Sequence, residues 1–300
     1  MENRPHTPVL LHEVIENLDL KEGQVVVDGT VGFGGHAGEI CEIIGDTGTL
    51  FALDADARAL RSAEEHLQSY PATKIFIQGN FREIKELVAE KGLSQVDRVL
   101  FDLGVNSAQL DEVGRGFSFR RDEPLLMTLS DVPGDRLTAK DLLNTLSAEE
   151  LAGIIYAYGE EQFSRRIATA VVEARDIKPI ETTGELVKII ESAVPVFYTK
   201  RKIHPATKTF QALRIAVNDE LEALKEGLVG AWDILSPSGR LAVISFHSLE
   251  ARIVKNFNNS HKVDGTGRLI KKHAVKPTQG EKKINSRSRS AELRVIEKII

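Results

Sequence analysis

The sequence predicts an α/β fold, in which a mostly parallel β-sheet flanked by helices is interrupted by a mostly helical insertion. In the first hundred residues, short apolar segments alternate with amphipathic helical stretches, as in a parallel sheet with right-handed crossovers. This alternation stops over residues 107–207 and then resumes. We therefore expect a discontinuous sheet domain, formed by residues 1–110 and 208–300, and a helical insertion over residues 111–207.

Four buried strands are expected before the insertion, because each candidate is a short apolar run bounded by polar or turn residues. The strands are Gln24–Asp28, Thr49–Asp54, Lys74–Gln78 and Asp97–Asp102. Amphipathic helices are predicted between them, near His36–Ile44, Ala57–Gln68 and Ile84–Lys91.

The insertion contains several prolines and no convincing buried strand. Its predicted helices are Ala148–Tyr158, Glu161–Ala174 and Thr183–Ala193. After the insertion, apolar residues recur on one helix face across Phe210–Leu235, and a turn at 237–239 precedes a strand at Arg240–Phe246. Two last strands are expected at Leu269–Val275 and Leu293–Ile299, which completes a Rossmann-like sheet of seven strands.

The composition excludes several classes of protein. Apolar residues make up 42% of the chain, which is typical of a globular protein, and no apolar run is long enough to cross a bilayer. The first residues lack the apolar segment of a secretory signal, so a cytoplasmic protein is expected. The single cysteine, Cys41, excludes an intramolecular disulfide and a multi-cysteine zinc site, and no metal site is predicted.

The charge is unevenly distributed along the chain. The formal net charge is −5, but residues 268–300 hold ten Lys/Arg against three Asp/Glu. A second stretch, 195–217, contains five basic residues and no acidic one. Because salt screens charges beyond roughly 8–10 Å, local patches decide whether phosphates bind. The two stretches indicate a nucleic-acid surface, and the simpler alternative is a solvated basic tail.

A glycine-rich loop follows the first predicted strand and opens a helix. Gly32, Gly34 and Ala37 satisfy the G-x-G-x-x-[GA] pattern, and Asp54 lies 22 residues after Gly32 at the end of the second strand. Such a loop brings the backbone close to a ligand, and the acid suits ribose hydroxyls. On these features alone, an NAD site and an S-adenosylmethionine site look alike.

Two acidic residues favour methyl transfer. Asp28 opens the loop, where a carboxylate suits a cationic ligand and would repel a pyrophosphate. Asp102 ends the fourth strand, where its carboxylate, with Asn106, can orient an amine for attack on a methyl group. Cys41 lies within a predicted helix, so we disfavour carbon methylation through a thiolate.

Other polar and aromatic residues have two interpretations each. His247 follows a strand end and can contact a base or a phosphate, or cap the helix Leu249–Asn256. Phe117 and Phe119 can stack on an extruded base, although anchoring the insertion is the stronger interpretation. Arginine binds phosphate oxygens through two parallel hydrogen bonds. The predicted RNA-binding residues are Lys200, Arg201, Lys202, Arg287 and Arg289.

Eight sequence blocks, taken together, resemble the RsmH (MraW) family of bacterial 16S rRNA cytosine-N4 methyltransferases. They include DGTVGFGGH (28–36), DLGVNSAQLD (102–111), RGFSF (115–119), HPATKTFQALRIAVNDEL (204–221) and NSRSRSAELR (285–294). The resemblance covers nearly the whole chain. It implies a class I methyltransferase domain that uses S-adenosylmethionine, and methylation of a decoding-site cytidine in the small ribosomal subunit. It is also compatible with a homodimer.

The resemblance also implies positions for the cofactor contacts. They are Gly34, Gly35, His36, Asp54, Phe81, Asp102 and Gln109. Of these, Phe81 is placed beside the adenine, although an ordinary core aromatic would fit its sequence context equally well.

One segment departs from the family pattern. Residues 124–130 read Pro-Leu-Leu-Met-Thr-Leu-Ser, where the family has two acids and an arginine. This departure keeps open a binding protein that retains the cofactor site without catalysis. The third alternative, an NAD-dependent oxidoreductase, rests on the glycine pattern alone.

Overall fold

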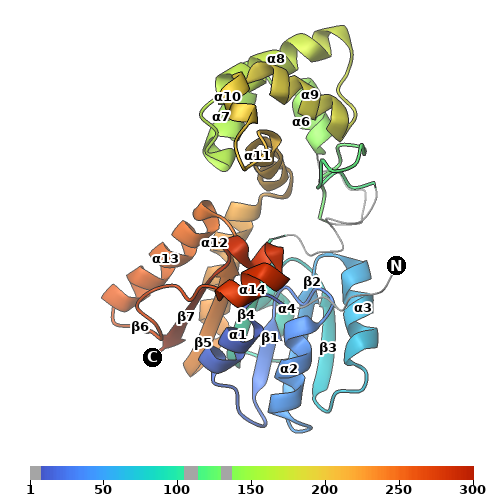
Figure 1. Ribbon diagram of the computed structural model, residues 1–300. Coiled ribbons are helices and arrows are strands. Elements are labelled where there is room, and N and C mark those ends of the chain that lie inside the picture. The colour runs from blue at the N-terminus through green and yellow to red at the C-terminus, as the bar shows by residue number, and fades with distance from the viewer. Residues whose placement is uncertain (1–7, 105–113, 130–136) are drawn as a thin grey trace. The chain divides into compact units, whose positions relative to one another are not determined.

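The computed structural model describes residues 8–104, 114–129 and 137–300 (Figure 1). The chain divides into two compact units. Unit 1 contains residues 1–104 and 221–300, and unit 2 contains residues 105–220. Among the described residues, no helix is both long and apolar enough to cross a membrane.

Unit 1 is built on one seven-stranded sheet with the order β3-β2-β1-β4-β5-β7-β6. The first five strands pair in parallel, and β7 pairs antiparallel with both β5 and β6. The predicted α/β sheet is therefore confirmed. The strands are β1 (Val25–Asp28), β2 (Thr49–Asp54), β3 (Thr73–Gln78), β4 (Val96–Asp102), β5 (Leu235–Ser245), β6 (Gly267–Leu269) and β7 (Glu292–Lys298).

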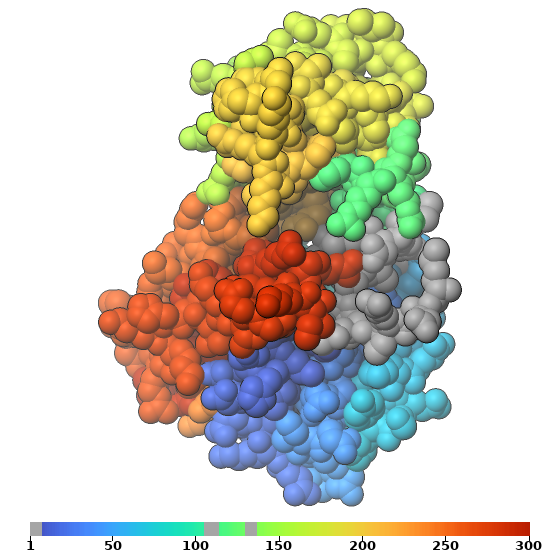
Figure 2. Space-filling view, viewed as in Figure 1, coloured from blue at the N-terminus to red at the C-terminus, as the bar shows by residue number. Residues whose placement is uncertain are grey.

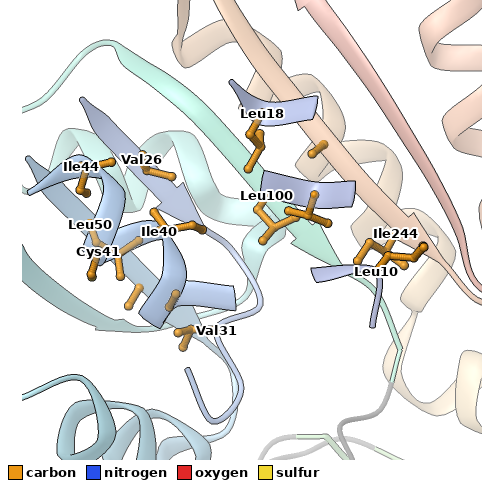
Figure 3. Close-up of a cluster of buried hydrophobic side chains, with 14 of the residues drawn as sticks. Leu10, Leu18, Val26, Val31, Ile40, Cys41, Ile44, Leu50, Leu100 and Ile244 are labelled. Atoms are coloured by element: carbon orange, nitrogen blue, oxygen red, sulfur yellow. The ribbon is translucent and has the colours of Figure 1, made fainter. Parts of the chain in front are cut away.

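Helices cover both faces of this sheet (Figure 1). On one face, α1 (Leu11–Leu18) and α2 (Gly35–Ile44) pack against strand residues such as Val26, Leu50 and Leu100 in the cluster shown in Figure 3. On the other face, a second cluster gathers apolar residues of α4 (Ile84–Ala89), α12 (Glu220–Ile234) and α13 (Ser248–Val263). The remaining helical elements of the unit are α3 (Ala57–Leu67), η1 (Phe81–Glu83), α14 (Gln279–Ile284) and η2 (Ser286–Ser290).

Several predicted elements need correction. The helix expected over Phe210–Leu235 is two helices, α11 (Ala206–Asn218) and α12, because Asp219 adopts a left-handed backbone conformation with φ 51° and ends α11. The strand expected at Leu269–Val275 is the short edge strand β6, with Val275 forming only an isolated bridge to Leu293. The turn predicted at 237–239 is included in an irregular start of β5.

Unit 2 is mostly helical in its described part, and its helices enclose their own apolar core. Side-chain caps fix three helix starts: Thr138, Ser147 and Thr182 each form a reciprocal pair with the acid three residues later. The helix predicted at Glu161–Ala174 begins three residues later. The helices are α6 (Ala139–Thr145), α7 (Ala148–Gly159), α8 (Ser164–Ile177), α9 (Thr183–Ala193), α10 (Val196–Thr199) and α11 (Ala206–Asn218).

Candidate functional site

Three carboxylates lie at the carboxyl ends of three adjacent strands of unit 1. Asp54 ends β2, Asp28 ends β1 and Asp102 ends β4, and the sheet places these strands side by side. Ligands of open α/β sheets bind at this edge. The described residues therefore bring together the three acids that the sequence analysis singled out.

The glycine loop is fastened to the strands on both sides of β1. Gly29 N–H donates to Leu100 O at 2.9 Å, and Val31 N–H donates to Leu53 O at 2.9 Å. Gly32 and Gly34 have positive φ angles of 53° and 83°, which L side chains rarely adopt. The loop then enters α2, whose first N–H groups have no acceptor within the helix.

Asp54 is hydrogen-bonded to this loop, and its carboxyl group has a raised pKa. Its carboxylate accepts hydrogen bonds from Gly32 N–H at 2.9 Å and from Asp56 N–H at 2.8 Å. Burial raises the pKa of Asp54 to about 6, and these backbone donors limit the rise. Each carboxylate oxygen has a second lone pair, so Asp54 can still accept a hydroxyl donor from a ribose.

Asp28 is buried beside the same loop. Its carboxylate accepts a hydrogen bond from Thr30 N–H at 3.1 Å. Burial, with a smaller contribution from the nearby charge of Asp54, raises the pKa of Asp28 to about 7. A cationic ligand placed here would favour the ionised carboxylates, so the site is complementary to positive charge.

Asp102 is the third of these buried carboxyl groups. Burial raises its pKa well above the usual range, and the charges of Asp28 and Glu250 add to the effect. Among the described residues, its Oδ1 has no hydrogen-bond partner, although the atom is buried. A buried polar atom without a partner carries a desolvation cost, and a ligand that donates a hydrogen bond would remove it.

His36 lies between Asp102 and the start of the described chain. Its Nε2 is 3.0 Å from Val9 O, and a carbonyl only accepts, so the hydrogen is placed on Nε2. The other ring nitrogen, Nδ1, faces Asp102 Oδ2 at 3.7 Å. The predicted site residue His36 is therefore next to the predicted catalytic carboxylate.

Sequence reasoning missed a short segment that lies over the loop, residues 8–10. A methyl group added at Gly35 would be 2.5 Å from Pro8 Cγ, so Pro8 packs directly on that glycine. Leu10 N–H donates to Glu281 Oε1 at 2.9 Å. Of the eight sequence blocks that resemble the family, one, HTPVLL (6–11), covers this segment.

Phe81 lies close to the glycine loop and packs partly into the core. Its ring centroid is 5.0 Å from that of Phe101, and the ring is half-buried. The Phe101 ring in turn lies directly against Gly29, which leaves no room for a side chain there. Contact of Phe81 with an adenine stays a prediction. Asn106 and Gln109 lie outside the described residues.

The structure gives His247 a structural role as the N-cap of α13. Its Nδ1 accepts from Glu250 N–H at 3.4 Å, and Glu250 Oε2 accepts from His247 N–H at 3.2 Å. The second ring nitrogen lies 3.1 Å from Glu250 Oε1. The helix-cap interpretation is confirmed, and a catalytic contact of His247 stays a prediction.

The predicted RNA-binding residues fall in both units. Lys200, Arg201 and Lys202 are exposed in unit 2. In unit 1, η2 carries Arg289, which is exposed, and Arg287, which is half-buried. Figure 2 shows the C-terminal segment (red) at the surface.

The divergent segment 124–129 serves the core of unit 2. Leu125 and Met127 are fully buried. Asn218 holds the backbone of the segment, because its Oδ1 accepts from Leu129 N–H at 2.8 Å and its Nδ2 donates to Met127 O at 2.7 Å. These bonds do not depend on the side chains that depart from the family pattern. The anchoring role is likewise confirmed for Phe117, which is buried in this core, and for Phe119, which packs on Phe210 at 5.1 Å.

The sequence profile of the MraW methylase family matches residues 3–299. The chain belongs to this family. Curated relatives named ribosomal RNA small subunit methyltransferase H include those of Brevibacillus brevis and Syntrophobacter fumaroxidans, each 44% identical over 98% of this chain and 98% and 96% of theirs. The relative of the same name from Heliobacterium modesticaldum is 45% identical over 98% of both chains.

Membership of this family decides between the interpretations of the glycine loop. The predicted class I methyltransferase fold and its cofactor, S-adenosylmethionine, are confirmed, and the NAD-dependent alternative is set aside. The fit is physical as well. The site has glycines where the backbone is left-handed and three buried carboxyl groups, whose charge is complementary to a cationic ligand.

Proposed function

We propose that this protein transfers a methyl group from S-adenosylmethionine to 16S rRNA in the small ribosomal subunit, and that the acceptor is the N4 amine of a decoding-region cytidine. The names of the curated relatives support the small-subunit rRNA as substrate. The sequence blocks of the family support the cytidine amine. The observation that carries the chemistry is the buried, unpartnered Oδ1 of Asp102 at the end of β4.

Bound S-adenosylmethionine supplies a methyl group on a positively charged sulfur. Asp54 suits its ribose hydroxyls, and Asp28 complements its positive charge. That same charge favours ionised Asp102, whose pKa is otherwise raised. Cofactor binding therefore prepares the carboxylate for its role as a hydrogen-bond acceptor.

Asp102 is placed to orient the target amine. An exocyclic amine has two hydrogens, and a carboxylate oxygen that accepts one of them fixes the direction of the nitrogen lone pair. After transfer, the amine nitrogen must lose a proton. Asp102 can accept it, and His36 Nδ1, 3.7 Å from Asp102 Oδ2, can stabilise the protonated carboxyl.

The test measures transfer of labelled methyl groups from S-adenosylmethionine to unmodified small subunits, with free 16S rRNA in parallel. Digested nucleosides are identified by mass. N4-methylcytidine is the expected product, and Asp102→Ala should abolish its formation while Asp46→Asn, at an exposed turn, leaves it unchanged. A different methylated nucleoside would refute the N4 assignment. Cofactor binding without any product would support a binding protein that has lost catalysis.

A further inference from the structure

Exposed apolar side chains and cations occur together in one turn of unit 2, residues 196–203. Val196, Phe197 and Ile203 are 72%, 61% and 62% exposed. Lys200, Arg201 and Lys202 lie between Phe197 and Ile203 in the sequence and are exposed as well. Figure 2 shows the segment around residue 200 (yellow) at the surface. We call residues 196–203 the basic–aromatic turn.

Tyr198 anchors the turn to the core of unit 2. Its hydroxyl donates to Glu161 Oε2 at 2.6 Å, and Glu161 is fully buried. Glu161 Oε1 also accepts from Phe163 N–H at 2.8 Å, and the Phe163 ring meets the Tyr198 ring edge-on at 4.9 Å. Burial and the bond to Glu161 raise the pKa of Tyr198 to about 12, so the hydroxyl remains a donor at neutral pH.

The anchored tyrosine also positions a cation. The Arg201 guanidinium lies 4.6 Å from the centre of the Tyr198 ring and 5.9 Å from that of Phe197. Such cation–π contacts restrict the arginine side chain. The turn therefore presents an exposed aromatic ring beside an oriented guanidinium, with Lys200 and Lys202 on either side in the sequence.

We propose that the basic–aromatic turn binds unpaired nucleotides of the RNA substrate, with Phe197 stacking on a base and Lys200 and Lys202 contacting phosphates. The inference rests on the proposed function, because it takes RNA as the substrate. Aromatic rings interleaved with cations are how proteins bind single strands without reading sequence. The four-residue helix α10 is too short to form the long amphipathic face with which helices bind membranes.

The first test is binding of a fluorescent single-stranded 16S rRNA fragment, with the same fragment paired in a duplex as the comparison. Phe197→Ala should weaken single-strand binding about tenfold. Its salt dependence should stay parallel to that of the parent, because stacking releases no counterions. Phe197→Trp should restore the affinity, and thermal unfolding would verify that both variants are folded.

Two further variants separate stacking from charge. Log affinity falls with log salt, and Lys200→Ala combined with Lys202→Ala should make this fall less steep by about 1.4, as expected for loss of two phosphate contacts on a single strand. Tyr156→Ala is the matched control, since this tyrosine is 67% exposed in the same unit and lies outside the turn. It should bind RNA like the parent.

Two results would overturn the inference: parental single-strand affinity of Phe197→Ala, or an equal loss of affinity for the duplex. Loss of binding to anionic phospholipid vesicles in Phe197→Ala, with RNA binding intact, would instead identify a membrane surface. Methylation of small subunits by the parent protein is measured in parallel. Absence of product there would refute the proposed function, while the single-strand comparison still tests the turn.

Discussion

Glu281 accepts a hydrogen bond from the backbone N–H of Leu10 at 2.9 Å, although 271 positions separate the two residues. Leu10 has a left-handed backbone with φ 55°, and its neighbour Val9 bonds to His36 through its carbonyl oxygen. Glu281 belongs to α14, which directly precedes the arginines of η2. Residues 8–10 thus contact both the basic C-terminal segment, through Glu281, and the glycine loop with the start of α2, through Gly35 and His36.

Removing this hydrogen bond should weaken cofactor binding. In Glu281→Ala, Leu10 N–H loses its acceptor, and the segment that positions His36 and covers Gly35 is less restrained. We expect the Kd for S-adenosylmethionine, measured by calorimetry, to rise about three- to tenfold, as for loss of the net contribution of one ordinary intramolecular hydrogen bond. Glu281→Gln keeps an acceptor oxygen and should recover most of the affinity, whereas equal losses in both variants would implicate charge instead.

Gly35 should tolerate no side chain. In Gly35→Ala, the new methyl group would be 2.5 Å from Pro8 Cγ and would push residues 8–10 off the loop. We expect weaker binding of S-adenosylmethionine by about tenfold, since a shift of this size costs 1–3 kcal/mol. Gly153→Ala is the control, because nothing lies within 4 Å of its added methyl group within α7. It should bind the cofactor normally and raise the free energy of unfolding by about 0.5–1 kcal/mol.

The raised pKa of Asp28 predicts how stability depends on pH. The ordinary value is 3.8 and the folded value is about 7, so the folded state binds more protons between these limits. The free energy of unfolding therefore falls as pH rises from about 4 to 7, by an amount on the order of 4 kcal/mol for this shift. Asp28→Asn should remove this part of the fall, as urea unfolding across this pH range would show, while Asp54 and Asp102, whose pKa values are also raised, still contribute theirs. A parallel pH profile in the variant would contradict the assignment.

The affinity for the cofactor should rise with pH because of Asp28, whereas the free energy of unfolding falls. A cationic ligand prefers ionised Asp28, so its binding releases a proton from the raised carboxyl. We expect the Kd for S-adenosylmethionine to fall as pH rises from 6 to 8, and calorimetry in buffers of different ionisation enthalpy to detect the proton. In Asp28→Asn this dependence should flatten. A pH-independent Kd in the parent would show that the cation does not approach Asp28.

The three strands that end in the acids of the site were predictable because most of their residues are buried, on both faces of the sheet. The second strand was placed without error at Thr49–Asp54, and the third and fourth begin one residue before their predicted starts. Continuous apolar runs identify such strands. The edge strand Gly267–Leu269 has no such run and was therefore misplaced. Its position is set by antiparallel pairing with β7.

The features that escaped prediction depend on contacts between distant residues. The helix Leu11–Leu18 ends where Arg98 donates to Leu18 O and Asp19 O, and Arg240 donates to Asn17 O. The apolar residues keep a helical spacing across Asp219, so this spacing does not indicate the break between α11 and α12. The acids of the site were found because strand ends are local features, whereas the bond from Leu10 to Glu281 is not.

Asn218 offers a last test, on the segment whose side chains depart from the family pattern. Asn218→Ala would leave Leu129 N–H and the Met127 carbonyl without this partner, and the bond to Met127 is buried. We expect the free energy of unfolding of unit 2 to fall by about 3 kcal/mol, at about 1–3 kcal/mol for each unpaired group. Asn218→Asp keeps the acceptor for Leu129 N–H but places a carboxylate oxygen against the Met127 carbonyl, so it should not recover the lost stability at neutral pH.

The measurement must follow unit 2 itself. The single tryptophan, Trp232, belongs to unit 1, so its fluorescence would miss an unfolding step confined to the helical unit. Circular dichroism at the helix band reports both units, and an early transition absent from the fluorescence would assign the loss to unit 2. Asn259→Ala, at an exposed position of α13, should shift neither signal. If Asn218→Ala unfolds like the parent by both probes, the bonds of Asn218 to residues 127–129 do not stabilise the insertion, and the divergent side chains must hold it by packing alone.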